Sequence, residues 1–230
     1  MRRAPFTAAL LLAALIAGCG GGSTKTSEIP GGGGSSVAPT TTQASKPPAG
    51  CTSVSKPAPK KEGGQKKPKA PLASGKTYKI TFETNCGSFS VQLDTKTAPN
   101  ASASMVSLAN AGFFDGTVFH RIVPGFVIQG GDPTGTGQGG PGYKTVDKPP
   151  KGAKYTLGVV AMAKTGTEKP GTAGSQFFVV TGNAGLPADY AVLGKVASGL
   201  DAVKRIGQLG DSSEQPTFTV VIKRATAGAS

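Results

Sequence analysis

The segment Phe119–Asp132 (FHRIVPGFVIQGGD) holds the only histidine of the 230-residue chain, His120, directly before Arg121. The β-branched and aromatic residues around this pair are typical of a strand. Neighbouring side chains on a strand point to opposite faces, so these two cannot share one face. An arginine is always charged and holds its donors in a rigid fork, so it suits hydrogen bonding to a ligand or a partner. Taken alone, a single histidine on a strand is more often structural, and Arg121 could be a surface ion-pair partner.

Other chemically versatile residues are scarce. With three cysteines and one histidine in the chain, a zinc site is nearly excluded, and we expect no metal and no cofactor. The glycine-rich stretch Gly135–Gly142 (GTGQGGPG) lacks the GxxxxGK[ST] order of a phosphate-binding loop and has no strand and helix around it. It is better interpreted as a long loop at the rim of a β domain.

The elements that must position Arg121 are mostly short strands. Tyr78–Glu83 and Ser88–Asp94 alternate apolar and polar residues and flank the turn Asn85-Cys86-Gly87, which predicts a hairpin. Apolar residues at helical spacing follow Thr97, a reasonable N-cap, and Gly112 ends this stretch, which predicts a first helix. A second helix is expected over Leu200–Leu209. Further strands are predicted at Val118–Val123, Phe126–Gln129, Leu157–Ala163, Gln176–Thr181, Val192–Val196 and Thr217–Lys223.

About eight strands and two helices predict a mainly β domain over residues 74–230: a closed eight-stranded antiparallel β-barrel capped by two α-helices. Residues 1–18 have the pattern of a signal peptide, with a basic start and the apolar run Ala8–Ala17. The sequence Ile16-Ala17-Gly18-Cys19 resembles a bacterial lipobox. It predicts lipidation of Cys19 and anchoring to the cell membrane on its extracytoplasmic side.

Residues 19–73 are rich in Gly, Pro and Lys and poor in large apolar residues, which predicts a disordered tether. The chain has a net charge of +13, and the lysines of the tether could contact anionic lipids or wall polymers, or could simply be solvated. Nucleic acid is a poor candidate partner because an exported chain would not meet it. If Cys19 is lipidated, Cys51 and Cys86 remain. A disulfide between them fits an oxidising compartment, but their spacing alone leaves the pairing open.

Three motifs in this order resemble the cyclophilin family of peptidyl-prolyl isomerases: Phe119–Asp132, Ala161-Met162-Ala163 and Gly174–Phe178 (GSQFF). The likeness extends over residues 76–224 and includes LANAGFFDGTVFHR and ADYAVLGKV. The resemblance implies an eight-stranded antiparallel barrel with two helices, in agreement with the strand count.

The resemblance also implies a role for each matched residue. Arg121 would be the principal catalytic residue, with His120, Phe126 and Gln129 completing the catalytic set. Alternation along the strand puts Arg121 on the substrate face and leaves His120 to brace the site. The implied substrate-binding residues are Val127 and Phe178 in the proline pocket, Gln176 for the substrate backbone, Ala163 and Lys164 for main-chain contacts, and Leu186 and Tyr190 in the far wall.

The implied function is acceleration of the rotation of X–Pro peptide bonds in exported proteins, by an arginine beside an apolar proline pocket. Its partners would be proline-containing polypeptides, and a monomer is the simplest assembly. One alternative is a non-catalytic module that binds proline-containing segments at the cell envelope. Another is a purely structural lipoprotein, which would leave the set of Arg121, Phe126 and Gln129 unexplained. That intact set favours the enzyme.

Overall fold

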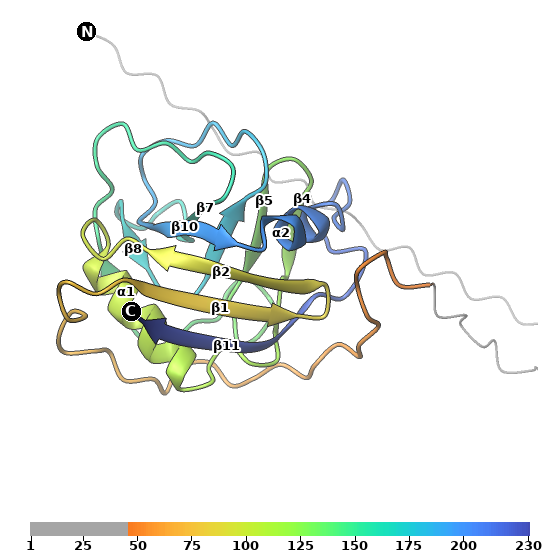
Figure 1. Cartoon of the computed structure of the whole chain (residues 1–230), viewed down its shortest axis with the longest axis horizontal. Coiled ribbons are helices and arrows are strands. Elements are labelled where there is room, and N and C mark those ends of the chain that lie inside the picture. Colours follow the sequence, from red (N-terminus) through yellow and green to blue (C-terminus); the bar gives the residue numbers. More distant parts are fainter. Residues whose placement is uncertain (1–45) are drawn as a thin grey trace, which may run out of the picture. The chain divides into compact units, whose positions relative to one another are not determined.

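In the computed structural model, residues 46–230 form a curled antiparallel sheet with two helices (Figure 1). The expected signal peptide, Cys19 and residues 20–45 lie outside the described residues. The strands are β1 (Tyr78–Thr84), β2 (Gly87–Leu93), β3 (Thr117–Val118), β4 (Arg121–Val123), β5 (Val127–Gly130), β6 (Thr145–Val146), β7 (Val159–Met162), β8 (Thr172–Ala173), β9 (Phe177–Val180), β10 (Val192–Ser198) and β11 (Val221–Ala229).

Nine strands form one sheet in the order β3-β11-β1-β2-β10-β7-β9-β5-β4, while β6 and β8 pair separately. The expected hairpin is confirmed, since β1 and β2 are antiparallel neighbours with Phe82 opposite Phe89. The expected closed eight-stranded barrel is wrong. The main sheet is an open, curled half-barrel whose edges are β3 and β4.

The sheet stays open because the expected strand Val118–Val123 is divided between its two edges. The chain leaves β3 at Val118 and enters β4 at Arg121. The edge strands have only two and three residues. Their neighbouring amides bond elsewhere: Phe119 N donates to Val220 O at 3.0 Å, and Ile122 N donates to Glu214 O at 3.1 Å. No ladder between β3 and β4 therefore forms.

The two expected helices are confirmed as α1 (Pro99–Asn110) and α2 (Leu200–Gly207). Thr97, the expected N-cap, does not cap α1. Instead the Asp147 carboxylate, which follows β6, accepts hydrogen bonds from Asn100 N at 3.2 Å and Ala101 N at 2.6 Å. A carboxylate there satisfies free amides and complements the helix dipole. In the described part of the chain, no helix is long and apolar enough to cross a membrane.

The two faces of the sheet carry separate apolar clusters. The inner cluster is built around aromatic rings, with 4.9 Å between the ring centroids of Phe82 and Phe177. Phe89, Phe114 and Phe119 pack around them. A smaller cluster on the other face contains Val127 and Phe178. Strands β7 and β9 are buried on both faces, which explains why their sequences are continuously apolar rather than alternating.

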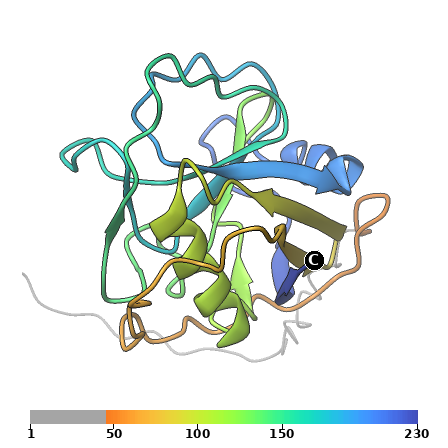
Figure 2. The same ribbon diagram turned by 60° about the vertical axis from the view of Figure 1, so that its left-hand side comes forward.

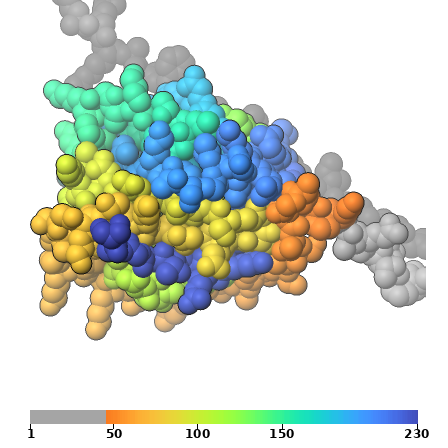
Figure 3. Space-filling view, viewed as in Figure 1, coloured from red at the N-terminus to blue at the C-terminus, as the bar shows by residue number. Residues whose placement is uncertain are grey.

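Residues 46–73, here called the strap, differ from the expected disordered tether. They run in an extended course along the domain, drawn in orange to gold below the sheet in Figure 1, and continue past α1 into β1 (Figure 2). In Figure 3 their atoms are continuous with the surface of the domain. Backbone amides of the strap donate to the domain, among them Thr52 N to Asn85 O at 2.7 Å. Backbone hydrogen bonds of this kind do not depend on the apolar content of a segment, so the composition did not predict them.

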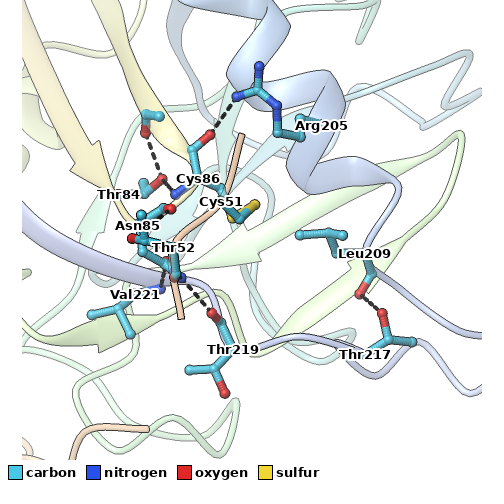
Figure 4. The surroundings of a disulfide bond; sticks show 11 residues. Cys51, Thr52, Thr84, Asn85, Cys86, Arg205, Leu209, Thr217, Thr219 and Val221 are labelled. Carbon is cyan, nitrogen blue, oxygen red and sulfur yellow. Dashed lines mark hydrogen bonds between the residues drawn. A yellow bond between two sulfur atoms is a disulfide. The ribbon is translucent and has the colours of Figure 1, made fainter. Parts of the chain in front are cut away.

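Cys51 of the strap and Cys86 in the β1–β2 turn form a disulfide (Figure 4). Asn85 Nδ2 donates to Thr52 O at 2.9 Å, and Arg205 Nη1 of α2 donates to Cys86 O at 2.7 Å. Both cysteines are buried. The disulfide therefore belongs to a bonded junction between the strap, the hairpin and α2.

Candidate active site

The register of four strands places three of the expected site residues, Arg121, Gln129 and Phe178, in one row. Arg121 of β4 lies opposite Gln129 of β5, Gln129 lies opposite Phe178 of β9, and Phe178 lies opposite Ala161 of β7. Cross-strand neighbours on one face are within contact distance of each other. The residues that alternate with this row belong to the inner core: Ile122, Ile128, Phe177 and Val179.

A pocket of about 340 Å³ lies on this outer face of the sheet. The side chains of Val127 and Phe178 at its base are 2% and 5% exposed. Nine residues line it, and all nine were expected in the site from the sequence: Arg121, Phe126, Val127, Gln129, Ala163, Lys164, Phe178, Leu186 and Tyr190. We call it the proline pocket, after the pocket that the resemblance implies.

Arg121 lies at the rim of the proline pocket, with its side chain 31% exposed. Its Nε donates to Glu214 Oε2 at 2.6 Å, and its Nη1 is 3.5 Å from Gln129 Oε1. The guanidinium carbon lies 5.9 Å from the centre of the Phe126 ring. A guanidinium has five N–H donors, so these two bonds orient it and leave other donors for a bound molecule.

Glu214 was missed by the sequence analysis. It lies in the turn before β11, and its hydrogen bond from Arg121 holds the pKa of its carboxyl below the usual value although partial burial acts in the opposite direction. No sequence pattern links Glu214 to Arg121, because the contact depends on how the turn folds over β4.

Gln129 and Gln176 link the proline pocket to a smaller neighbouring cavity of about 100 Å³. Gln129 Nε2 donates to Gln176 Oε1 at 3.1 Å. Gln176 Nε2 then donates to Gly137 O and Gly139 O, both at 2.9 Å. Gln176 thus lies beside the proline pocket rather than in its wall, and both amides are held in fixed orientations.

The loop after β5, residues 132–144, forms the rim of this smaller cavity and is called the rim loop. Asp132 is fully buried and accepts bonds from Thr134 N at 2.7 Å and Gly137 N at 2.6 Å. Burial raises the pKa of Asp132, but bonds from Thr134, Gly139 and Gly137 together hold it below its usual value. The expectation that the glycine-rich stretch is a rim loop agrees with this geometry.

The far wall depends on Lys164, whose side chain is only 3% exposed. Its Nζ pairs with Asp189 Oδ2 at 2.6 Å, donates to Glu168 O at 3.1 Å, and lies 5.6 Å from the centre of the Tyr190 ring. Tyr155 Oη donates to Tyr190 O at 2.6 Å and fixes the same wall. Asp189 and Tyr155 are supporting residues that the sequence analysis missed. The main-chain role implied for Lys164 therefore accompanies a structural role of its side chain.

His120 is not brought to the proline pocket. It lines a different cavity of about 150 Å³, together with Lys56 of the strap and Pro216. Both ring nitrogens are buried, and neither has a hydrogen-bond partner among residues 46–230. Burial lowers the pKa of His120, Asp132 opposes this, and Arg121 adds to it. A neutral imidazole in this separate cavity is consistent with bracing the site.

Within residues 46–230, no group of three His, Cys, Asp or Glu side chains is arranged to hold a metal ion. The proline pocket can hold an apolar ring, and the guanidinium at its rim can donate hydrogen bonds to a group attached to that ring. The side-chain amides of Gln129 and Gln176 lie next to the guanidinium and the pocket in fixed orientations. Such a site can stabilise a distorted ligand by hydrogen bonding and charge.

Comparisons with known proteins agree with this geometry. A family described as "Cyclophilin type peptidyl-prolyl cis-trans isomerase/CLD" matches residues 79–227. A peptidyl-prolyl cis-trans isomerase-like 1 protein of Gibberella zeae is 41% identical over 155 residues, which cover 65% of this chain and 94% of that protein. A peptidyl-prolyl cis-trans isomerase of Arabidopsis thaliana is 37% identical over 65% of this chain and 93% of its own length.

A crystal structure of a cyclophilin type isomerase from Cryptosporidium parvum matches with a TM-score of 0.60 and 32% identity, covering 67% of this chain and 99% of that one. The strap lies before the residues that the family matches. The matched region contains the proline pocket, Arg121 and both glutamines. The chain therefore belongs to the cyclophilin family and is a peptidyl-prolyl cis-trans isomerase.

Proposed function

We propose that the proline ring of a substrate binds between Phe126, Val127 and Phe178, and that Arg121 catalyses rotation about the preceding peptide bond. The observation that carries this proposal is the position of the Arg121 guanidinium at the rim of an apolar pocket, held by Glu214 and Gln129. The pocket keeps the ring fixed while the preceding part of the peptide rotates.

The X–Pro bond rotates slowly because it has partial double-bond character, with a barrier of roughly 18–20 kcal/mol. In the twisted transition state this conjugation is lost, and the lone pair localises on the prolyl nitrogen. A hydrogen bond from Arg121 to that nitrogen is stronger in the twisted state than in either planar state. Such differential stabilisation accelerates the reaction. Loss of one preorganised donor costs about 3–4 kcal/mol in other enzymes.

Gln129 and Gln176 position the substrate backbone in this account. Their side-chain amides are joined by a 3.1 Å hydrogen bond, so the free donor and acceptor positions that remain have defined directions. No bond is formed or broken in the reaction. The site needs only to hold the proline ring, orient the substrate backbone and stabilise the twisted transition state.

The test is to follow cis–trans exchange of an Ala-Pro peptide with the full chain. The proposal predicts faster exchange at catalytic concentrations of protein. A non-catalytic binding module would shift the signals of the peptide on binding and leave its exchange rate unchanged.

The cellular setting is a separate part of the proposal: a monomer anchored to the cell membrane through lipid on Cys19, acting on exported proteins. The lipobox-like sequence before Cys19 supports it, and so does the Cys51–Cys86 disulfide, because such bonds persist in oxidising compartments. Replacing Cys19 by Ala should move the protein from the membrane fraction to the soluble fraction. An unchanged membrane fraction would contradict lipid anchoring at this residue.

A further inference from the structure

The rim loop is bonded on one side by the strap. Three backbone amides of the strap and one lysine side chain donate to its carbonyl oxygens. The bonds are Lys60 N to Pro133 O at 2.8 Å, Gly63 N to Gly140 O at 2.9 Å, Gln65 N to Pro141 O at 3.1 Å, and Lys67 Nζ to Lys144 O at 3.0 Å. The strap therefore contacts the rim loop near its start and along its second half.

The rim loop is bonded on its other side by the active site. The side-chain nitrogen of Gln176 donates to Gly137 O and Gly139 O, between the segments that the strap holds. Gln176 in turn accepts from Gln129, and Gln129 lies next to Arg121. Hydrogen bonds, joined by the backbone of the rim loop between Gly139 and Gly140, thus connect the strap to the guanidinium.

The strap is itself held to the domain by hydrogen bonds and a disulfide, so it can hold the rim loop in place. Lys60 Nζ donates to three carbonyl oxygens in the turn after α1: Gly112 O at 3.2 Å, Phe113 O at 2.7 Å and Asp115 O at 3.1 Å. Burial lowers the pKa of Lys60, and Asp115 opposes that effect. The Cys51–Cys86 disulfide ties the other end of the strap to the β1–β2 turn.

We infer that the strap is a positioning element of the active site, with Lys60 and the backbone amides of Gly63 and Gln65 as its positioning groups. By fixing the rim loop, they fix the orientation of Gln176, and through Gln129 they fix the guanidinium of Arg121. The inference rests on the proposed function of Arg121. It assigns a catalytic contribution to residues that lie outside the region matched by the family. Small displacements of catalytic groups lower rates strongly, so release of the strap should be visible in kcat.

The test compares two double variants of the full chain. Lys60→Asp/Gln65→Pro removes the ammonium from the three carbonyls and the amide donor to Pro141 O. Its control, Lys61→Asp/Gln65→Ala, makes the same change of charge at an exposed neighbour and keeps both Lys60 and the amide of residue 65. Circular dichroism shows that each is folded, and kinetics are measured well below the unfolding temperature. The side-chain amide signals of Gln129 and Gln176 are followed by NMR.

We expect kcat to fall about three- to tenfold in Lys60→Asp/Gln65→Pro, with a smaller change in KM and with shifted signals of both glutamine amides. The control should match the wild type in all three measurements. If the first variant is less stable but keeps the kcat and the glutamine signals of the wild type, the strap stabilises the fold only and the inference is overturned. If the wild type itself does not accelerate isomerisation, the proposed function fails instead.

Discussion

Arg121 Nε and Glu214 Oε2 lie 2.6 Å apart although 93 residues separate them in the chain. Glu214 has a backbone φ of 65°, a left-handed conformation that non-glycine residues rarely adopt. Strained residues of this kind persist where the surrounding structure over-determines them, often at active sites. The strained turn thus brings a carboxylate to the residue on which the proposed mechanism depends.

Replacing Glu214 by Ala should lower kcat/KM about two- to fivefold, because a partly exposed ion pair contributes up to about 1 kcal/mol to orienting Arg121. Glu214→Gly removes the same carboxylate but accepts the left-handed backbone. It should lose similar activity while being about 1 kcal/mol more stable to unfolding than Glu214→Ala. Full activity in both variants would show that the carboxylate does not orient Arg121.

The stability of the protein should fall between pH 7 and pH 5 because of His120, the only histidine in the chain. Its folded-state pKa lies below 6.5 owing chiefly to burial, so the unfolded chain takes up the proton first as the pH falls. The contribution is complete above pH 6.5 and is lost as the pH falls from there toward the folded-state pKa. The melting temperature of His120→Gln should change less between these pH values. An equal change in both proteins would exclude His120 as the cause.

Lys164→Met should reduce the free energy of unfolding by about 1–3 kcal/mol. It leaves Asp189 and the backbone carbonyls of Thr165 and Glu168 without their donor. Lys144 offers a matched control, because it pairs with Glu168 at 3.0 Å but has a side chain 55% exposed. Lys144→Met should lose at most about 1 kcal/mol. Urea unfolding measures both. Equal losses would mean that burial of the Lys164 ammonium adds nothing to the far wall.

Reduction of the Cys51–Cys86 disulfide should lower the free energy of unfolding by about 3–4 kcal/mol in the chain-entropy model, given a sequence separation of 35 residues. The reductant should have no effect on a Cys51→Ser/Cys86→Ser variant, which separates loss of the bond from other effects of the reagent. A melting temperature that does not respond to reduction of the wild type would contradict the prediction.

The residues that line the proline pocket were expected from the resemblance to cyclophilins, and strand pairing explains why several of them meet on one face. Arg121, Gln129 and Phe178 come from separate strands, and residues of one face meet wherever the strands pair in register. The motifs that resemble cyclophilins contain these strands, and it was the resemblance that named the residues. Alternation predicts opposite faces for His120 and Arg121. The two residues line different cavities, but His120 precedes β4 rather than lying on it.

The other features of the fold and the site depend on contacts that sequence patterns do not encode. Asp147 caps α1 from the segment after β6, and Glu214 reaches Arg121 from a turn. The strap has the composition of a disordered segment, yet Lys60 and its neighbours bond to backbone carbonyls of the domain. Backbone acceptors are present in every loop, so the sequence alone does not reveal which of them a lysine-rich segment will meet.

The central claim is that Arg121 stabilises the twisted transition state. It is tested most directly by the rate of cis-to-trans conversion of an Ala-Pro peptide with wild type, Arg121→Ala and Arg121→Lys, each checked for fold by circular dichroism. The account predicts that kcat/KM falls at least about tenfold in Arg121→Ala, and that Lys restores little because it lacks the rigid fork of donors. A well-folded Arg121→Ala that accelerates the conversion as fast as the wild type would contradict it.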